Sequence, residues 1–157
     1  MGKHSRTPRL RVRSALAAGL VGLGSVGSVG TASAQGPALV EGTPCTDVAR
    51  ACVDLASQQA WLIDGGTVAR GPVPISSGTE GEETPRGDFH VMWKDQDHYS
   101  AEFDDAPMPF SVFFAEGGIA FHEGNVETTS AGCVRLTEED AIAFFDYLAV
   151  NDAVQVR

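Results

Sequence analysis

A single segment of this 157-residue chain has the spacing of an amphipathic helix. Ala141, Phe144, Phe145 and Leu148 recur at helical intervals and would form one apolar face. Thr137 precedes them as a capping residue, and three acidic residues follow it in the first turn. The other apolar residues occur in short runs bounded by glycine and proline, which is typical of strands. The sequence therefore predicts a mainly β domain with one helix packed on it.

The expected strands are residues 51–55, 59–64, 67–70, 73–76, 89–93, 111–114, 119–122 and 153–156. Gly65 and Gly66 favour a hairpin turn between the second and third of these strands. Residues 94–109 are polar and acidic, contain two prolines and show no periodicity. Loops of that length in compact domains are often functional, so we expect a lid here.

Residues 1–34 have the layout of a secretory signal peptide. Five Lys or Arg residues precede an uncharged run at 15–29, and the small residues 32–34 precede Gln35. The alternative is a membrane anchor, but the run is shorter than the ~20 residues that span a bilayer. We expect a signal peptide at 1–34, a lead-in segment at 35–50, one domain at 51–157, and a secreted product without a stable membrane anchor.

Loss of that signal peptide would remove five of the 11 basic residues and leave six against 21 acidic ones, a net charge of −15. Such a surface repels nucleic acid and anionic lipid. A solvated acidic surface is the simplest interpretation, and a field that attracts cationic amine substrates is the alternative. His90 and His98 lie eight residues apart without zinc-type spacing, so we expect no metal and no cofactor.

The residue types needed for thiol acyl transfer occur close together in the segments 121–124 and 130–136. Cys133 is a nucleophile once a base removes its proton, and the imidazole of His122 is the usual base at neutral pH. Gly132 allows close backbone approach, and the N–H groups around it can face a developing oxyanion. The pattern predicts Cys133 as nucleophile and His122 as base and then acid.

Three further residues are candidates for substrate binding. In an extended segment Arg135 shares a face with Cys133, where it would favour thiolate and could hold a substrate carboxylate. A structural salt bridge is an equal alternative for Arg135. The Ser130 hydroxyl would bind substrate or brace its turn, and Tyr99 is the best candidate for substrate contact in the expected lid.

The three cysteines divide into a pair and a single thiol. Cys45 and Cys52 lie seven residues apart, outside the motif, and export would expose them to oxidising conditions. We expect a disulfide that closes a short loop, worth roughly 2–3 kcal/mol in the chain-entropy model. Cys133 is then the unpaired thiol that a nucleophile must be. The alternative is two unpaired structural thiols.

Residues 122–124 and 130–135 together resemble a signature of the L,D-transpeptidase (YkuD-type) catalytic domain family. That signature reads His-x-Gly and then Ser-His-Gly-Cys-x-Arg or Asn. The run from Thr84 to Phe89 resembles the family's second signature, Thr-Pro-x-Gly-x-Phe, which we expect to position a turn by the cleft. Residues 107–122 are similar to small secreted actinobacterial members.

The resemblance covers residues 51–157 and implies a β-sandwich-like fold with one helix. It implies that Cys133 attacks the bond between the third residue and the terminal D-Ala of a peptidoglycan stem, so that D-Ala leaves and an acyl-thioester remains. The amine of another stem would resolve the thioester and cross-link two third residues at the cell wall. Carbapenem-type β-lactams would acylate the same thiol.

Two alternatives stay open. If water resolves the thioester, the protein is an L,D-carboxypeptidase. Ala131 stands where the family has histidine, and this departure favours a non-catalytic peptidoglycan-binding module; the His122 and Cys133 pair, which binding would not need, argues against it.

Overall fold

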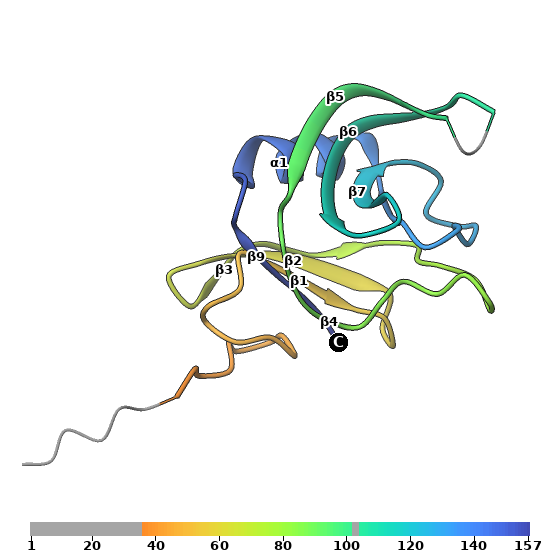
Figure 1. Cartoon of the computed structure of the whole chain (residues 1–157). Helices are drawn as coiled ribbons and strands as arrows, with labels where there is room; N and C mark the ends of the chain where they lie inside the picture. The colour runs from red at the N-terminus through yellow and green to blue at the C-terminus, as the bar shows by residue number, and fades with distance from the viewer. Residues whose placement is uncertain (1–35, 102–103) are drawn as a thin grey trace, which may run out of the picture. The chain divides into compact units, whose positions relative to one another are not determined.

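The computed structural model describes residues 36–101 and 104–157 (Figure 1), so the expected signal peptide lies outside the described residues. The prediction of a mainly β fold with one helix is confirmed. Within these two ranges, no helix has the length and apolar character needed to cross a membrane. The elements are β1 (Ala51–Asp54), β2 (Gln59–Asp64), β3 (Thr67–Pro74), β4 (Gly87–His90), β5 (Trp93–Ser100), β6 (Ala106–Ala115), β7 (Ile119–Glu123), β8 (Val134–Leu136), α1 (Glu138–Tyr147) and β9 (Ala153–Val156).

The first sheet has five strands in the order β3-β2-β1-β9-β4. All its pairs are antiparallel except β1 with β9. The expected hairpin at Gly65 and Gly66 joins β2 to β3, and β3 is an edge strand that tolerates proline. The predicted disulfide between Cys45 and Cys52 is present and ties the lead-in segment to β1.

The second sheet has four strands in the order β5-β6-β7-β8. Our prediction of a structureless lid at residues 94–109 was wrong, because most of this stretch lies in the β5–β6 hairpin (Figure 1). Proline is compatible with the first half of β6, because β7 pairs only with residues 112–115, near the C-terminal end of β6. At Pro107 and Pro109 one edge of β6 is therefore free, and a missing N–H costs little.

The predicted strand at residues 89–93 was also wrong. It is divided between the two sheets, because β4 belongs to the first sheet and β5 to the second. Val91 lies at the crossing, is buried, and joins the core between the sheets. A mostly apolar run can thus carry the chain from one layer to the next.

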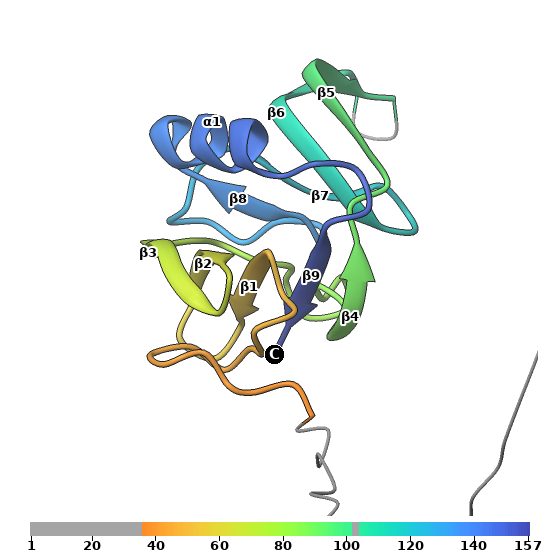
Figure 2. The ribbon, with the colours of Figure 1, turned by 90° about the vertical axis from the view of Figure 1, so that its left-hand side faces the viewer.

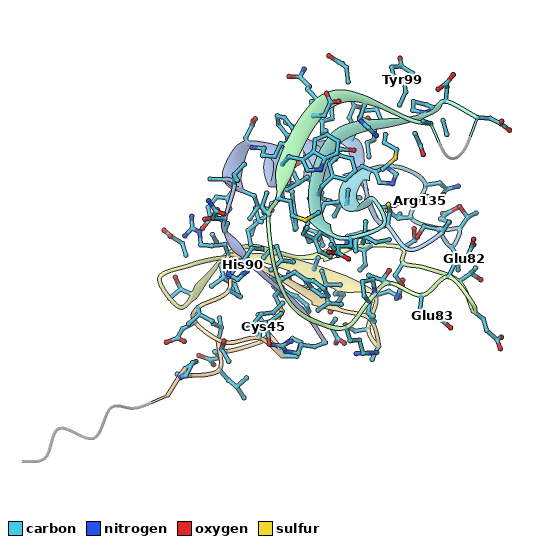
Figure 3. All side chains as sticks on the ribbon, viewed as in Figure 1. Cys45, Glu82, Glu83, His90, Tyr99 and Arg135 are labelled. Carbon is cyan, nitrogen blue, oxygen red and sulfur yellow. A yellow bond between two sulfur atoms is a disulfide. The ribbon has the colours of Figure 1, made fainter. Side chains whose placement is uncertain are left out.

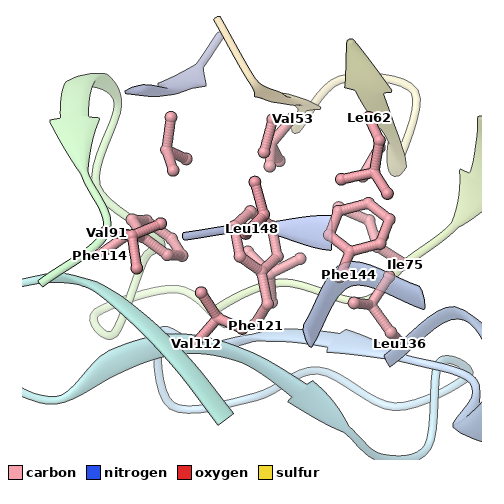
Figure 4. Packing of buried hydrophobic residues seen from close by; sticks show 14 of the residues in the cluster. Val53, Leu62, Ile75, Val91, Val112, Phe114, Phe121, Leu136, Phe144 and Leu148 are labelled. Atoms are coloured by element: carbon pink, nitrogen blue, oxygen red, sulfur yellow. The ribbon is translucent and has the colours of Figure 1, made fainter. Parts of the chain in front are cut away.

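Side chains from both sheets and from α1 form one core. Figure 4 shows Val53 and Leu62 of the first sheet on one side and Val112 and Phe121 of the second on the other. Phe144 and Leu148, from α1 and its C-terminal cap, lie between them. The two sheets are therefore held together by apolar burial.

The helix α1 is fixed at both ends by polar contacts. Thr137 is its N-cap, and the Thr137 hydroxyl accepts the Asp140 N–H and donates to the Asp140 carboxylate. At the C-terminal end, the Lys94 ammonium group donates to the carbonyls of Phe145 and Leu148. A lysine of β5 thus supplies the positive charge that a helix C-terminus favours.

Candidate active site

The parallel pair β7 and β8 brings the two predicted catalytic residues to one cavity. His122 lies in β7 opposite Arg135 of β8, and Cys133 directly precedes β8. Both side chains line a cavity of about 670 Å³ that runs toward the β5–β6 hairpin. The predicted residues Ser130, Arg135 and Tyr99 line it as well, and Figure 2 shows β7 and β8 beside each other.

His122 is only 7% exposed and is held in one orientation. Its Nδ1–H donates to the Glu123 carbonyl at 2.6 Å, so Nε2 remains as the nitrogen that can accept a proton. Burial lowers the pKa of His122 to about 4, with smaller contributions from the charges of Arg135 and His98, while the Glu123 hydrogen bond opposes the shift. At neutral pH the ring is therefore uncharged.

Cys133 is a free, half-buried thiol. It packs against a small apolar cluster of Met108, Phe113 and Ala120, and its Sγ lies 3.5 Å from the Gly118 carbonyl. Burial raises the pKa of the Cys133 thiol, and the Ala120 N–H and the charge of Arg135 oppose this shift. The resting site therefore holds a neutral thiol and a neutral imidazole, and proton transfer must accompany nucleophilic attack.

The turn from Ser130 to Cys133 is braced from within. The Ser130 hydroxyl donates to the Cys133 carbonyl at 2.5 Å and accepts the Gly132 N–H at 3.2 Å. Gly132 has φ +105, and a Cβ there would lie 2.6 Å from the Ile119 side chain. The backbone conformation therefore favours glycine immediately before Cys133, and a larger residue would also have to displace the end of the Ile119 side chain.

Thr84 connects the second signature to this turn. Its hydroxyl donates to the Gly132 carbonyl at 2.7 Å and accepts the Gly78 N–H at 3.0 Å. Because a trans peptide points its C=O and N–H in opposite directions, the Cys133 N–H faces away from Thr84. No hydrogen-bond partner for the Cys133 N–H occurs within the described ranges, so this group is available to an oxyanion.

Arg135 keeps its charge free of carboxylates. The guanidinium donates to the carbonyls of Thr128 and Thr129 and to the Thr128 hydroxyl, at 3.0 to 3.3 Å. It makes no ion pair with a carboxylate of residues 36–101 or 104–157. Its stem lies against Gly124, where a Cβ would come within 2.8 Å. Neutral oxygens thus hold a cation at the cavity wall, where it can bind an anionic group.

The β5–β6 hairpin forms the opposite wall. Trp93 stacks on Phe113 with ring centroids 3.7 Å apart, and the edge of His98 meets Phe113 at 5.0 Å. Tyr99 lies in β5, is 60% exposed, and is on the hairpin in Figure 3, whereas we had expected it in a loop. Sequence reasoning missed the role of His98 as a cavity-lining residue, because residues 94–109 lacked a strand pattern.

We find no cluster of metal-ligating side chains in the part of the chain that the structure describes. No three His, Cys, Asp or Glu side chains gather there in a group that could hold a metal ion.

The family model of the L,D-transpeptidase catalytic domain (YkuD) matches residues 49–156. Among solved structures, an L,D-transpeptidase from Stackebrandtia nassauensis is 27% identical with a TM-score of 0.64, over 68% of this chain and 54% of that one. An L,D-transpeptidase from Xylanimonas cellulosilytica is 26% identical with a TM-score of 0.63, over 73% and 63%. LD transpeptidase LdtMt1, solved in complex with imipenem, is 22% identical with a TM-score of 0.61, over 68% and 57%, and supports the fold. No match was found among curated proteins.

The chain spans between 54% and 63% of the length of these three solved chains. The match to the family model, by contrast, covers nearly all of the residues that the structure describes. Both family signatures meet at one turn, through the hydrogen bond between Thr84 and Gly132. The chain belongs to the L,D-transpeptidase (YkuD) catalytic domain family.

Proposed function

We propose that this domain is a cysteine-dependent L,D-transpeptidase that forms peptidoglycan cross-links between the third residues of two stem peptides. The observation that carries the proposal is the pairing of a free thiol with a buried imidazole in one cavity. Cys133 and His122 both line it, and His122 has one ring nitrogen free to accept a proton. A binding module would need neither group in this arrangement.

In the first half-reaction, Cys133 Sγ forms a bond to the carbonyl carbon of the third residue while its proton passes to His122 Nε2. The tetrahedral oxyanion faces the Cys133 N–H, a donor position typical of acyl-transfer sites. The bond to the leaving nitrogen then breaks, and that nitrogen takes the proton from His122 as D-Ala departs. An acyl-thioester on Cys133 and a neutral His122 remain.

Recognition of the donor stem would use the cation at the cavity wall. Arg135 can bind a carboxylate of the stem in a two-pronged hydrogen bond, because its charge is not already neutralised by a carboxylate. The cavity volume of about 670 Å³ is in the usual range for ligand sites and leaves room for a peptide segment. The disulfide supports the proposal that the domain works outside the cytoplasm, at the cell wall.

The test mixes purified protein with a carbapenem and measures intact mass. We expect one adduct on the wild type and none on Cys133→Ala, with peptide mapping that places the adduct on Cys133. A disaccharide-tetrapeptide substrate then separates the outcomes. Cross-linked dimer indicates a transpeptidase, and tripeptide with free D-Ala alone indicates an L,D-carboxypeptidase. Neither an adduct nor D-Ala release would make the domain a peptidoglycan-binding module.

A further inference from the structure

The hairpin wall of the cavity carries a second imidazole that the mechanism above leaves unused. His98 lines the cavity, and its Nδ1–H donates to the Asp95 carboxylate at 3.2 Å. Its side chain is 24% exposed, so it is more accessible than His122. A carboxylate that holds one imidazole nitrogen fixes the ring and leaves Nε2 as the proton acceptor.

The position of His98 is set by the apolar cluster beneath the nucleophile. Its ring meets Phe113 and Trp93 edge-on, with centroids 5.0 and 5.4 Å away. Phe113 belongs to the cluster against which Cys133 packs, and His98 pairs in register with Met108 of the same cluster. The imidazole therefore borders the surface on which Cys133 lies.

The two imidazoles occupy different sides of the cavity. His122 is in β7 and His98 is in β5, with β6 between them, so the two strands are about 10 Å apart at ordinary strand spacing. The residues are also offset along the strands, because His98 pairs with Met108 whereas Phe121, the neighbour of His122, pairs with Val112. A positive charge on His98 nevertheless contributes to the lowered pKa of His122. The groups are thus far enough apart to admit a substrate and close enough to influence one another.

In the proposed first half-reaction His122 serves the donor stem from the β7 side of the cavity. It is buried and its Nδ1 is bound to the Glu123 carbonyl, so its ring is fixed in one orientation. The β5–β6 hairpin forms one wall of the cavity, so an acceptor stem bound along it would lie beside His98. We propose that His98, oriented by Asp95, is the catalytic base for the acceptor in the second half-reaction; this inference rests on the proposed function.

The second half-reaction transfers the acyl group from Cys133 to the acceptor. The neutral acceptor amine, or water, forms a bond to the thioester carbon, and its proton passes to His98 Nε2. The C–S bond breaks, and the thiolate of Cys133 leaves. His98 gives its proton to solvent, and the thiolate takes one back, so the free enzyme is restored with one new amide or acid. No redox partner is needed.

The test separates the two half-reactions in His98→Gln, which keeps a donor toward Asp95. Stopped-flow acylation by a carbapenem reports the first step, and formation of cross-linked or hydrolysed product from tetrapeptide reports the second. We expect product turnover to fall by roughly 10²–10³-fold, as for loss of a general base, with accumulation of acyl-enzyme in the mass spectrum. Asp95→Asn should give a smaller loss in the same step.

His90→Gln is the matched control. His90 lies in β4 of the first sheet, is exposed, and lies well away from Arg135 in Figure 3. Turnover by the His90→Gln variant should equal that of the wild type. Addition of free imidazole should restore part of the turnover of His98→Ala, since a diffusing base can replace a lost one but cannot repair a packing defect.

Two results would overturn the inference. One is turnover of His98→Gln within about threefold of the wild type, which is below any general-base contribution. The other is a loss confined to acylation, with no accumulated acyl-enzyme and no rescue by imidazole, which would assign His98 to cavity structure. Failure of the wild type itself to form an adduct would instead refute the proposed function, so the two failures are distinguishable.

Discussion

The two sheets treat their charged side chains differently. Three arginines in or beside the first sheet form ion pairs with carboxylates: Arg50 with Asp64 and Asp152, Arg70 with Glu139 and Asp140, and Arg157 with Asp88. In the second sheet, Lys94 and Arg135 donate to neutral carbonyl oxygens instead. The first sheet uses its cations for structure, whereas the second keeps a cation available at the cavity.

The buried ionisable groups of the two sheets follow the same division. The first sheet is covered on its outer side by an apolar cluster that includes the disulfide and Trp61. The second sheet buries His122, whose pKa is strongly lowered, and places Cys133 at its edge. Burial of an ionisable group costs stability, so under the proposed function the second sheet gives up some stability for reactivity while the first supplies the framework. The predictions below test this division.

The largest effect is expected for the catalytic pair. His122→Ala should lower turnover on the order of 10³-fold, because the thiol loses its base and the leaving amine loses its acid. The slow residual reaction should speed up at alkaline pH as thiolate forms without help. Steady-state rates between pH 6 and 10 check this, and an unchanged pH–rate profile would remove His122 from the role of base.

The cost of burying His122 should appear in the pH dependence of stability. The unfolded state binds a proton near the ordinary pKa of 6.5, but the folded state does so only near 4. Between these values the unfolded state binds more protons, so stability falls as the pH drops. Between pH 7.5 and pH 4, we expect the free energy of unfolding of the wild type to fall by about 3 kcal/mol more than that of His122→Gln. Urea unfolding at both pH values measures this, and parallel losses would contradict it.

Removing the disulfide should affect the framework alone. Cys45→Ala with Cys52→Ala should lower the free energy of unfolding by about 2.5 kcal/mol, the loop-closure value for so short a ring. The rate of Cys133 acylation by a carbapenem should stay within twofold at a temperature where the variant remains folded. A tenfold slower acylation would show that the first sheet controls the reactive turn.

Thr84 is the point where framework and site meet. Thr84→Val keeps the shape but leaves the Gly132 carbonyl and the Gly78 N–H without their partner, at a cost of about 2 kcal/mol in stability. It should also slow acylation, because the peptide that presents the Cys133 N–H is no longer held. Thr67→Val is the control: its hydroxyl donates to the Asp64 carbonyl in an exposed turn of the first sheet. Thr67→Val should change neither the stability nor the rate of acylation appreciably.

Local patterns were sufficient for some elements. The hairpin at Gly65 and Gly66 and the capped helix α1 were predictable because their signals lie within a few neighbouring residues. The pairing of Cys45 with Cys52 followed from their short spacing and the expectation of export. Such features need no knowledge of what packs against them.

Other features depend on tertiary structure. Thr84 and Gly132 are 48 residues apart, so no local pattern reveals their hydrogen bond. Asp95 and His98 are three apart, a spacing that puts side chains on opposite faces of a regular strand. Asp95 and His98 are nevertheless in contact in β5. The partner strand β6 is irregular at this level, since Phe110 has φ +56. The cavity wall formed by the β5–β6 hairpin could therefore not be predicted from sequence patterns.

The smallest effect is expected at Ala131, a half-buried residue of the cavity beside the nucleophile. In the proposed mechanism His122 supplies the base, and the donor to the oxyanion is the Cys133 N–H, which does not depend on the side chain at 131. Ala131→His should therefore change carbapenem acylation and D-Ala release within roughly threefold, as for a substitution that removes no contact. The contrary result is that the wild type shows neither acylation nor D-Ala release and only Ala131→His reacts. In that case the second sheet of the natural protein provides a binding cavity without catalytic activity, and the two sheets differ in binding rather than in catalysis.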